Sequence, residues 1–305
     1  MTIKLGIIGM GVISHYYLKA LQQSTVCELR AVCDTSQERL APFAASPVAC
    51  HDDYATLLDD PQLDAVIINL PNHLHFDACK AALRAGKHVC CEKPLTLDLQ
   101  QALQLRDMAR RYQLTLLTAF HRRYNHHLLR ALEQGRFEGA RQVTARYHER
   151  IEEHAGRDTW YLDSASCGGG CVADNGPNVY DTLSFALGTL QVQRAEIRRN
   201  AMGVDMGAQI SLAGPGGLAV SAELSWDYPF GEQKDLLIEY ADGSQFIIDM
   251  LEGSEGFKTS LYHEYEGVLA HLASSIRGNA EDGTIGIDAV RLVRDTYALE
   301  ASDGR

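Results

Sequence analysis

Long apolar runs, paired cysteine motifs and an excess of basic residues are all missing from this sequence of 305 residues. No window approaches the ~20 consecutive apolar residues of a membrane helix, and the N-terminus lacks the small-residue cleavage site of a signal peptide. Acidic residues outnumber basic residues by 40 to 28, for a formal net charge of −12. This charge argues against nucleic acid or an anionic membrane as a partner, and we expect neither.

The eight cysteines form no recognisable metal or redox motif. None belongs to a CxxC pair, and Cys167 and Cys171 have no second pair with which to complete a zinc site. The segment HERIEEH (148–154) lacks the spacing of an HExxH zinc motif. We therefore expect no metal, and we interpret the cysteines as buried, reduced thiols of a cytoplasmic protein.

The first ~120 residues alternate regularly between two kinds of segment. Short apolar runs typical of strands occupy residues 3–8, 28–33, 64–69, 88–92 and 114–120. Segments with helical spacing lie between them, at 12–23, 36–45, 73–85 and 98–112. Apolar strands that alternate with amphipathic helices predict a doubly wound parallel sheet, so we place a Rossmann-type α/β domain at residues 1–122.

After about residue 123 the apolar residues alternate with a period of two. Such runs lie at 142–151, 191–201, 209–214, 218–226, 235–240 and 244–250. They predict an α+β domain at residues 123–305, with a large, open, mostly antiparallel sheet. Helices are expected at 124–135, 179–188, 261–278 and 287–301. The last of them is a candidate for packing back on the first domain.

The turn after the first strand, GMGVIS (9–14), has the spacing of a dinucleotide-binding loop, with Ser14 in place of the third glycine. Its glycines permit a tight turn and let the backbone approach a pyrophosphate. Asp34 closes the second strand, where a carboxylate binds ribose hydroxyls and repels a 2′-phosphate, so we predict NAD rather than NADP. Arg39 could reach the same region and works against this preference. The predicted loop contacts are Gly9, Met10, Gly11, Val12 and Ile13.

Two further strands end in polar clusters, INLPNHLH (68–75) and CCEKPL (90–95). Ligands of doubly wound sheets bind beyond the carboxyl ends of the strands, so both clusters are expected on the cofactor side. We predict cofactor contacts from Leu70, Pro71, Asn72, His75 and Glu92. Lys93 is predicted to point at the nicotinamide, although an exposed ion pair with Glu92 is the alternative.

Four segments in this order, GMGVIS, LPNHLH (70–75), AGKHVCCEKP (85–94) and GGGCVADNGPNVYD (168–181), resemble the Gfo/Idh/MocA family of oxidoreductases. The resemblance covers nearly the whole chain. It implies NAD(P)-dependent hydride transfer at a hydroxyl or keto carbon of a sugar, sugar derivative or cyclitol. It also implies a homodimer or homotetramer built through the C-terminal sheet. Finally, it implies that Lys93 contacts the reacting hydroxyl and that the Lys93–Pro94 bond is often cis.

The chain departs from this family where a catalytic histidine usually follows an aspartate by four residues. Here Asp174 is followed by Asn178, which cannot take a proton at neutral pH. Lys93 and Asp174 could relay the proton while Asn178 positions the substrate. Another group could replace the histidine, namely His121, Tyr180 or His263. A regulatory protein that binds NAD or sugar without turnover is the third explanation. We favour the first, because a pure binder needs neither Lys93 nor Asp174.

Several further residues are candidates for contacts with the substrate. Arg123 and Asp181 match positions that line the substrate sites of polyol-oxidising relatives, and both can bind hydroxyls through charge-assisted hydrogen bonds. Trp160 could stack on the apolar face of a sugar or belong to the core. The predicted substrate contacts are therefore Lys93, His121, Arg123, Trp160 and Asp181.

Overall fold

The computed structural model describes residues 2–155, 162–278 and 286–303 of the chain. The chain folds as two units. An N-terminal unit comprises Met1–Ala119 and Leu261–Ile287, and a C-terminal unit comprises Phe120–Ser260 and Asp288–Arg305. The first break lies close to the predicted boundary at residue 122. The helix that returns to the N-terminal unit is the penultimate helix, however, and not the last one.

Six parallel strands form the sheet of the N-terminal unit, in the order β3-β2-β1-β4-β5-β6. They are β1 (Ile3–Ile8), β2 (Cys27–Cys33), β3 (Ala49–His51), β4 (Ala65–Ile68), β5 (His88–Glu92) and β6 (Leu116–Ala119). Strands β4 and β6 are buried along their whole length, as expected for a sheet covered on both faces. The strand order reverses between β1 and β4, which is the switch point where doubly wound folds bind ligands.

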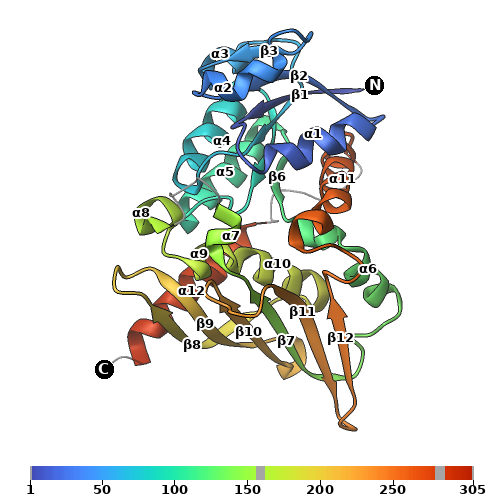
Figure 1. The fold of residues 1–305 in the computed structure, drawn as a ribbon, viewed down its shortest axis with the longest axis vertical. Coiled ribbons are helices and arrows are strands. Elements are labelled where there is room, and N and C mark those ends of the chain that lie inside the picture. The colour runs from blue at the N-terminus through green and yellow to red at the C-terminus, as the bar shows by residue number, and fades with distance from the viewer. Residues whose placement is uncertain (1, 156–161, 279–285, 304–305) are drawn as a thin grey trace. The chain divides into compact units, whose positions relative to one another are not determined.

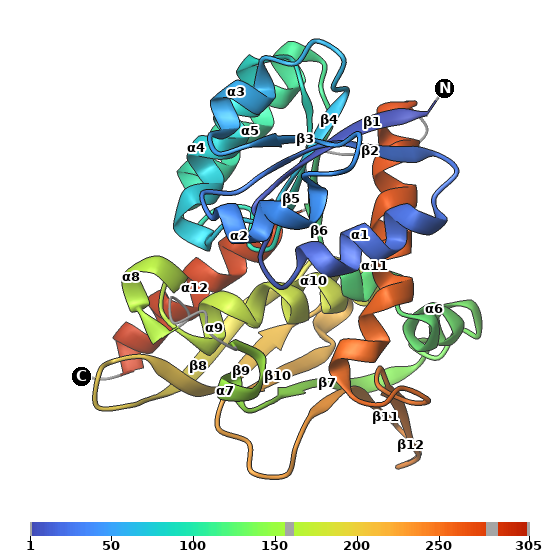
Figure 2. The same cartoon turned by 45° about the horizontal axis from the view of Figure 1, so that its top comes forward.

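Helices cover both faces of this sheet. They are α1 (Ser14–Gln23), α2 (Gln37–Leu40), α3 (Tyr54–Leu58), α4 (His75–Arg84), α5 (Leu99–Tyr112) and α11 (Phe257–Ile276). Figures 1 and 2 show α3, α4 and α5 on one side of the sheet, and α1 and α11 on the other. In α4, for example, the buried residues recur every three or four positions, which gives the helix one apolar face.

The prediction for this unit is confirmed in its class and in five of its strands, but β3 and α3 were missed. Strand β3 has only three residues, of which two are exposed, so it leaves no apolar pattern in the sequence. It also carries Cys50, the one exposed cysteine among the eight free thiols, so the expectation of burial is wrong there and confirmed for the other seven. No helix within the described ranges is long and apolar enough to cross a membrane.

The C-terminal unit contains a second six-stranded sheet, in the order β12-β11-β7-β10-β9-β8. Its strands are β7 (Ala140–His148), β8 (Gln191–Arg199), β9 (Asp205–Ala213), β10 (Ala219–Ser225), β11 (Gln233–Tyr240) and β12 (Gln245–Asp249). All neighbours pair antiparallel except β7 and β10, which are parallel; the predicted mostly antiparallel sheet is therefore confirmed. Alternate residues of β10 are buried, as the period-two pattern predicts.

One face of this second sheet is covered by helices, as Figure 2 shows for α9 (Cys171–Asp174), α10 (Gly176–Leu187) and α12 (Ile287–Asp303). The unit also contains α6 (His126–Glu133), α7 (Ile151–Ala155) and α8 (Ser164–Cys167). The glycine run before α9 lets the chain pass close to the sheet, because Gly170 forms a bridge with Asp205 at the start of β9. A Cβ on Gly170 would lie 2.4 Å from the carbonyl oxygen of Asp205.

Candidate functional site

The glycine turn after β1 has the features that a phosphate-binding loop requires. Gly9 has φ +93°, and a Cβ there would lie 2.6 Å from the carbonyl oxygen of Asn69, so only glycine fits. Gly11 has open space where its side chain would be, which leaves the backbone approachable. The Ser14 hydroxyl donates to the carbonyl oxygen of Gly11 at 2.7 Å and fixes the entry to α1. The predicted loop residues therefore form a narrow turn at the N-terminus of α1.

Asp34 lies at the end of β2 and anchors this turn from the side. Its carboxylate accepts hydrogen bonds from the backbone N–H groups of Met10 and Ser36, each at 2.8 Å. Arg39 also reaches it, with Nη1 at 3.3 Å from Oδ2, and the Arg39 side chain remains 45% exposed. The carboxylate predicted to select NAD and the guanidinium that works against it are thus ion-paired at one strand end.

Asn69, at the end of β4, was not predicted as a site residue. Both polar atoms of its side-chain amide are buried and have no hydrogen-bond partner among the described residues. A buried amide with no partner is costly, so its presence beside Gly9 points to a ligand that supplies the partners. The sequence signal was an asparagine that ends an otherwise apolar strand, which the sequence analysis included in the strand itself. The narrow glycine turn and this amide fit a dinucleotide at the switch point.

His75, at the first position of α4, is fully buried. Its Nδ1 lies 2.7 Å from the carbonyl oxygen of Pro94, and its Nε2 lies 2.7 Å from that of Leu70. Burial lowers the pKa of His75, and the two carbonyl oxygens oppose this shift. The ring therefore ties the loop after β4 to the turn after β5. Of the other predicted residues in this loop, Asn72 is buried and Leu70 and Pro71 are half-buried.

At the end of β5, the side chains of Glu92 and Lys93 have different surroundings. The Glu92 carboxylate is buried and accepts hydrogen bonds from the hydroxyls of Tyr17 on α1, at 3.0 Å, and Tyr265 on α11, at 3.2 Å. Burial raises the pKa of Glu92 to about 7, against the opposing effects of Lys93 and the tyrosine hydroxyls. Lys93 itself is half-buried, and the Lys93–Pro94 peptide bond is cis. An exposed Glu92–Lys93 ion pair, the alternative interpretation, is therefore wrong, because Glu92 is not exposed.

The C-terminal unit brings four of the predicted residues together, on α10 and on the short 3-10 helix η3 (His121–Tyr124). Arg123 donates to Asp181 in a bidentate ion pair with two contacts of 2.6 Å. Asp181 is buried, and burial raises its pKa to about 6 although the guanidinium lowers it. Next to this pair, Nδ2 of Asn178 lies 3.5 Å from Nε2 of His121. Trp160 lies outside the described residues.

Asp174, the last residue of α9, is 5% exposed. The segment around it is held by a buried ion pair between Lys234 and Glu149, whose Nζ–Oε2 distance is 2.5 Å. Glu149 also accepts a hydrogen bond of 2.9 Å from the side-chain amide of Asn175, the residue after Asp174. Burial lowers the pKa of Lys234, while the two glutamates near it oppose the shift. This network fixes the junction of α9 and α10, from which Asp174 and Asn178 project.

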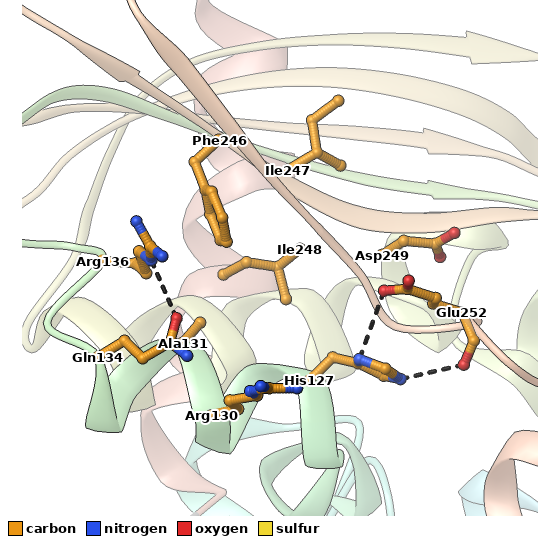
Figure 3. Close-up of a pocket in the computed structure, with 10 residues that line it drawn as sticks. All are labelled: His127, Arg130, Ala131, Gln134, Arg136, Phe246, Ile247, Ile248, Asp249 and Glu252. Carbon is orange, nitrogen blue, oxygen red and sulfur yellow. Dashed lines mark hydrogen bonds and ion pairs between the residues drawn. The ribbon is translucent and has the colours of Figure 1, made fainter.

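A pocket of about 290 Å³ also lies in the C-terminal unit, between α6 and β12 (Figure 3). Its lining contains none of the predicted site residues. Nδ1 of His127 lies 3.6 Å from Oε2 of Glu252, and the Arg136 guanidinium lies 4.4 Å from the Phe246 ring centroid. These contacts join α6 to the edge strand of the sheet, so we assign the pocket a structural role.

Comparison with known families identifies both parts of the chain. Residues 3–120 match a family described as an oxidoreductase family with an NAD-binding Rossmann fold. Residues 126–246 match the GFO/IDH/MocA C-terminal domain. The first match corresponds to the N-terminal unit up to β6, and the second lies within the C-terminal unit.

Similar proteins agree with this assignment. A 1,5-anhydro-D-fructose reductase from Ensifer adhaerens is 27% identical, over 93% of this chain and 91% of the relative. D-xylose 1-dehydrogenase (NADP(+)) 2 from Haloferax volcanii is 32% identical, over 78% of this chain and 73% of the relative. The crystal structure of GenD2 from gentamicin A biosynthesis, in complex with NAD, shares the fold with a TM-score of 0.88. It is 18% identical, and the alignment covers 100% of this chain and 95% of GenD2. The chain therefore belongs to the Gfo/Idh/MocA oxidoreductase family, and its N-terminal unit is the family's NAD-binding Rossmann domain.

Proposed function

We propose that the chain is an NAD(H)-dependent dehydrogenase or reductase that acts on a hydroxyl or keto carbon of a sugar, sugar derivative or cyclitol. The observation that carries this proposal is the position of Lys93 directly after β5, in a unit that matches an NAD-binding family. Strand β5 is two positions from β1 in the sheet, and neighbouring strands are about 5 Å apart. The end of β5, which Lys93 follows, is therefore roughly 10 Å from the end of β1, which the glycine turn follows. A reactive lysine there can serve a cofactor that the turn holds.

Lys93 and Asp174 are proposed to polarise the reacting oxygen. As the carbon–hydrogen bond breaks, negative charge develops on that oxygen, and a fixed ammonium group stabilises it. Asp174 is proposed to hold the reacting hydroxyl next to the Lys93 ammonium group by accepting a hydrogen bond from one of them. Asn178 would then orient the substrate, since an amide can both donate and accept.

The residues proposed to hold the cofactor are the glycine turn, Asp34 and Asn69. The turn offers backbone N–H groups to the phosphates, Asp34 accepts from ribose hydroxyls, and the amide of Asn69 gains the partners that it lacks within the chain. The nicotinamide, when bound, supplies the hydride acceptor or donor. His75 and Glu92 are predicted as direct contacts, but we propose that they shape the two loops. Both ring nitrogens of His75 lie against backbone carbonyl oxygens, and the Glu92 carboxylate faces Tyr17 and Tyr265.

A homodimer or homotetramer built through the C-terminal sheet is also proposed. The support is that helices cover only one face of this sheet within the described chain. Size-exclusion chromatography with light scattering tests the assembly, and a strictly monomeric protein would contradict it.

The function is tested by following nicotinamide absorbance with purified protein, NAD or NADP, and a panel of aldoses, inositols and sugar acids. Reduction of the cofactor by one or a few compounds supports the proposal and names the substrate class. A sensing protein of the same fold would instead bind NAD and sugar saturably without any turnover in either direction. That result would overturn the proposed enzyme activity.

A further inference from the structure

Two pairs of residues connect η3 to α10 and fix the position of one helix against the other. Arg123 and Asp181 form the bidentate ion pair, and two residues earlier on η3, His121 faces Asn178. The bidentate geometry resists rotation, since both guanidinium nitrogens would have to leave the carboxylate together. The ring of His121 is thereby held beside the amide of Asn178.

The contact between His121 and Asn178 is buried and incompletely satisfied. The two residues are 3% and 2% exposed, and Oδ1 of Asn178 is buried without a partner among the described residues. In the structure the NH2 group of Asn178 faces Nε2, and turning the amide by 180° brings Oδ1, which lacks a partner, to this ring nitrogen. When the oxygen accepts from Nε2–H, the other ring nitrogen, Nδ1, carries the lone pair and can act as a base. An asparagine orients a catalytic histidine in this way in Cys-His-Asn enzymes.

We propose that His121, oriented by Asn178, accepts the proton of the reacting hydroxyl. This inference rests on the proposed function, and it assigns the proton to His121 instead of a relay through Lys93. In the oxidation, the substrate O–H bond breaks and its proton goes to Nδ1 of His121. The C–H bond breaks with its electron pair leaving as hydride to the nicotinamide, and the C=O bond forms. In the reduction, His121 donates the proton.

The other candidates for this role are less suited to it. The hydroxyl of Tyr180 lies 2.5 Å from Oγ1 of Thr296, and complete burial raises the pKa of Tyr180 far above neutral. His263 belongs to α11, whereas the imidazole beside the buried amide of Asn178 is that of His121. Elements α10 and α6 pack against η3, and α9 precedes α10. Besides His121, the titratable or charged groups on these four elements are Arg122, Arg123, Tyr124, His126, His127, Arg130, Glu133, Cys171, Asp174, Tyr180 and Asp181. Histidine is the group on these elements whose ordinary pKa suits proton transfer near neutral pH.

A double-mutant cycle tests the assignment with the substrate found in the panel. His121→Asn should lower kcat roughly 100-fold or more and remove the acid limb of the kcat/KM profile in the oxidation direction. Its NADH affinity, measured by fluorescence, should stay within a few-fold of the wild-type value. In an Asn178→His background, which has a second imidazole at the neighbouring position, the same His121→Asn change should cost less than about tenfold. His127→Asn, in the same unit, is the matched control and should leave kcat unchanged.

The outcomes separate this inference from the function on which it rests. An active wild type whose His121→Asn variant keeps both its kcat and its acid limb would overturn the inference alone. Equal losses in the two backgrounds would also overturn it, because a purely structural role does not depend on a second base. A wild type that turns over no compound in either direction would overturn the proposed function, and this inference with it.

Discussion

Glu92 and Lys93 are neighbours in the sequence, yet the end of β5 gives their side chains different surroundings. Glu92 is 6% exposed and faces α1 and α11, where Tyr17 and Tyr265 bind its carboxylate. The two tyrosine rings pack edge to face with centroids 4.7 Å apart, so the hydroxyls are held in place. Lys93, one residue later, is half-buried at the strand end. The same three-residue motif thus contains one structural and one proposed catalytic side chain.

Replacing Lys93 by alanine should remove turnover while the cofactor still binds. We expect Lys93→Ala to lower kcat roughly 100- to 1000-fold, because the charge that develops on the reacting oxygen loses the cation proposed to stabilise it. The dissociation constant of NADH should change no more than a few-fold. Lys80→Ala, at a half-buried position of α4 outside the proposed site, is the control with the same loss of charge. Substantial activity in Lys93→Ala would show that the lysine assignment is wrong.

The ion pair between Asp34 and Arg39 makes a prediction about cofactor choice. Asp34→Asn keeps a side-chain oxygen for the N–H of Met10 or Ser36, but it removes the negative charge that repels a 2′-phosphate and that pairs with Arg39. We expect the ratio of kcat/KM for NADP to that for NAD to rise about tenfold or more. In the double variant Asp34→Asn/Arg39→Ala this gain should be lost. A ratio that stays constant in all variants would mean that cofactor choice is made elsewhere.

At the scale of elements, the position of α9 depends on its close approach to β9. Gly170 has extended backbone, so its need for glycine comes from contact alone: a Cβ would meet Asp205 backbone atoms at 2.4–2.9 Å. We expect Gly170→Ala to lower the free energy of unfolding by roughly 2–3 kcal/mol, measured by urea denaturation. Gly203→Ala, at a turn with φ +80° and open space, should cost only about 1 kcal/mol. Equal effects would contradict the packing argument.

The strand ends that form the proposed cofactor site could be predicted because their sequence signals are local. An apolar strand that ends in glycine, in aspartate or in Glu-Lys-Pro marks its own carboxyl end, and in a parallel sheet these ends meet at one edge. That is why the glycine turn, Asp34 and the EKP turn were all located from sequence. Strand β3 was missed because three residues, two of them exposed, carry no periodicity.

The partners of the predicted residues could not be found in this way, since they come from distant segments. Tyr265 is 173 residues from the carboxylate that it binds, and Asp181 is 58 residues from Arg123. Their motifs predict Arg123 and Asp181 as separate contacts to the substrate, whereas the fold pairs them with each other. Asn69 was missed for a different reason: what distinguishes it is the lack of a partner, which only the folded chain reveals.

At the scale of the whole molecule, the chain passes between its two units three times, at Ala119–Phe120, Ser260–Leu261 and Ile287–Asp288. Tyr265, which binds Glu92, lies on the segment that returns to the N-terminal unit. Loss of this unit's fold therefore releases α11, which is covalently continuous with both parts of the C-terminal unit. Both tryptophans of the chain, Trp160 and Trp226, fall between residues 120 and 260 and make fluorescence a probe of the C-terminal unit.

Glu92→Gln tests this coupling through the pH dependence of stability. The folded-state pKa of Glu92 is about 7, above its ordinary value of 4.5, so the folded protein binds the additional proton between these limits. The stability that protonation gives is fully present below about pH 4.5 and is lost as the pH rises through 7. The glutamine of the variant has no proton to lose, whereas the wild type loses the proton of Glu92 as the pH rises. The free energy of unfolding of the variant, minus that of the wild type, should therefore increase by roughly 2 kcal/mol between pH 5 and pH 8.

The measurement is urea denaturation at both pH values, followed by tryptophan fluorescence and by circular dichroism on the same samples. Glu28→Gln, which changes an exposed glutamate of the same sheet, should show no such growth. If the two units unfold together, the substitution in the N-terminal unit shifts the fluorescence transition of the C-terminal unit by the same amount as the dichroism transition. Two separate transitions, of which only the dichroism one moves, would show that the returning helix does not couple the units. A single shared transition that does not respond to pH would instead contradict the buried, protonated state of Glu92.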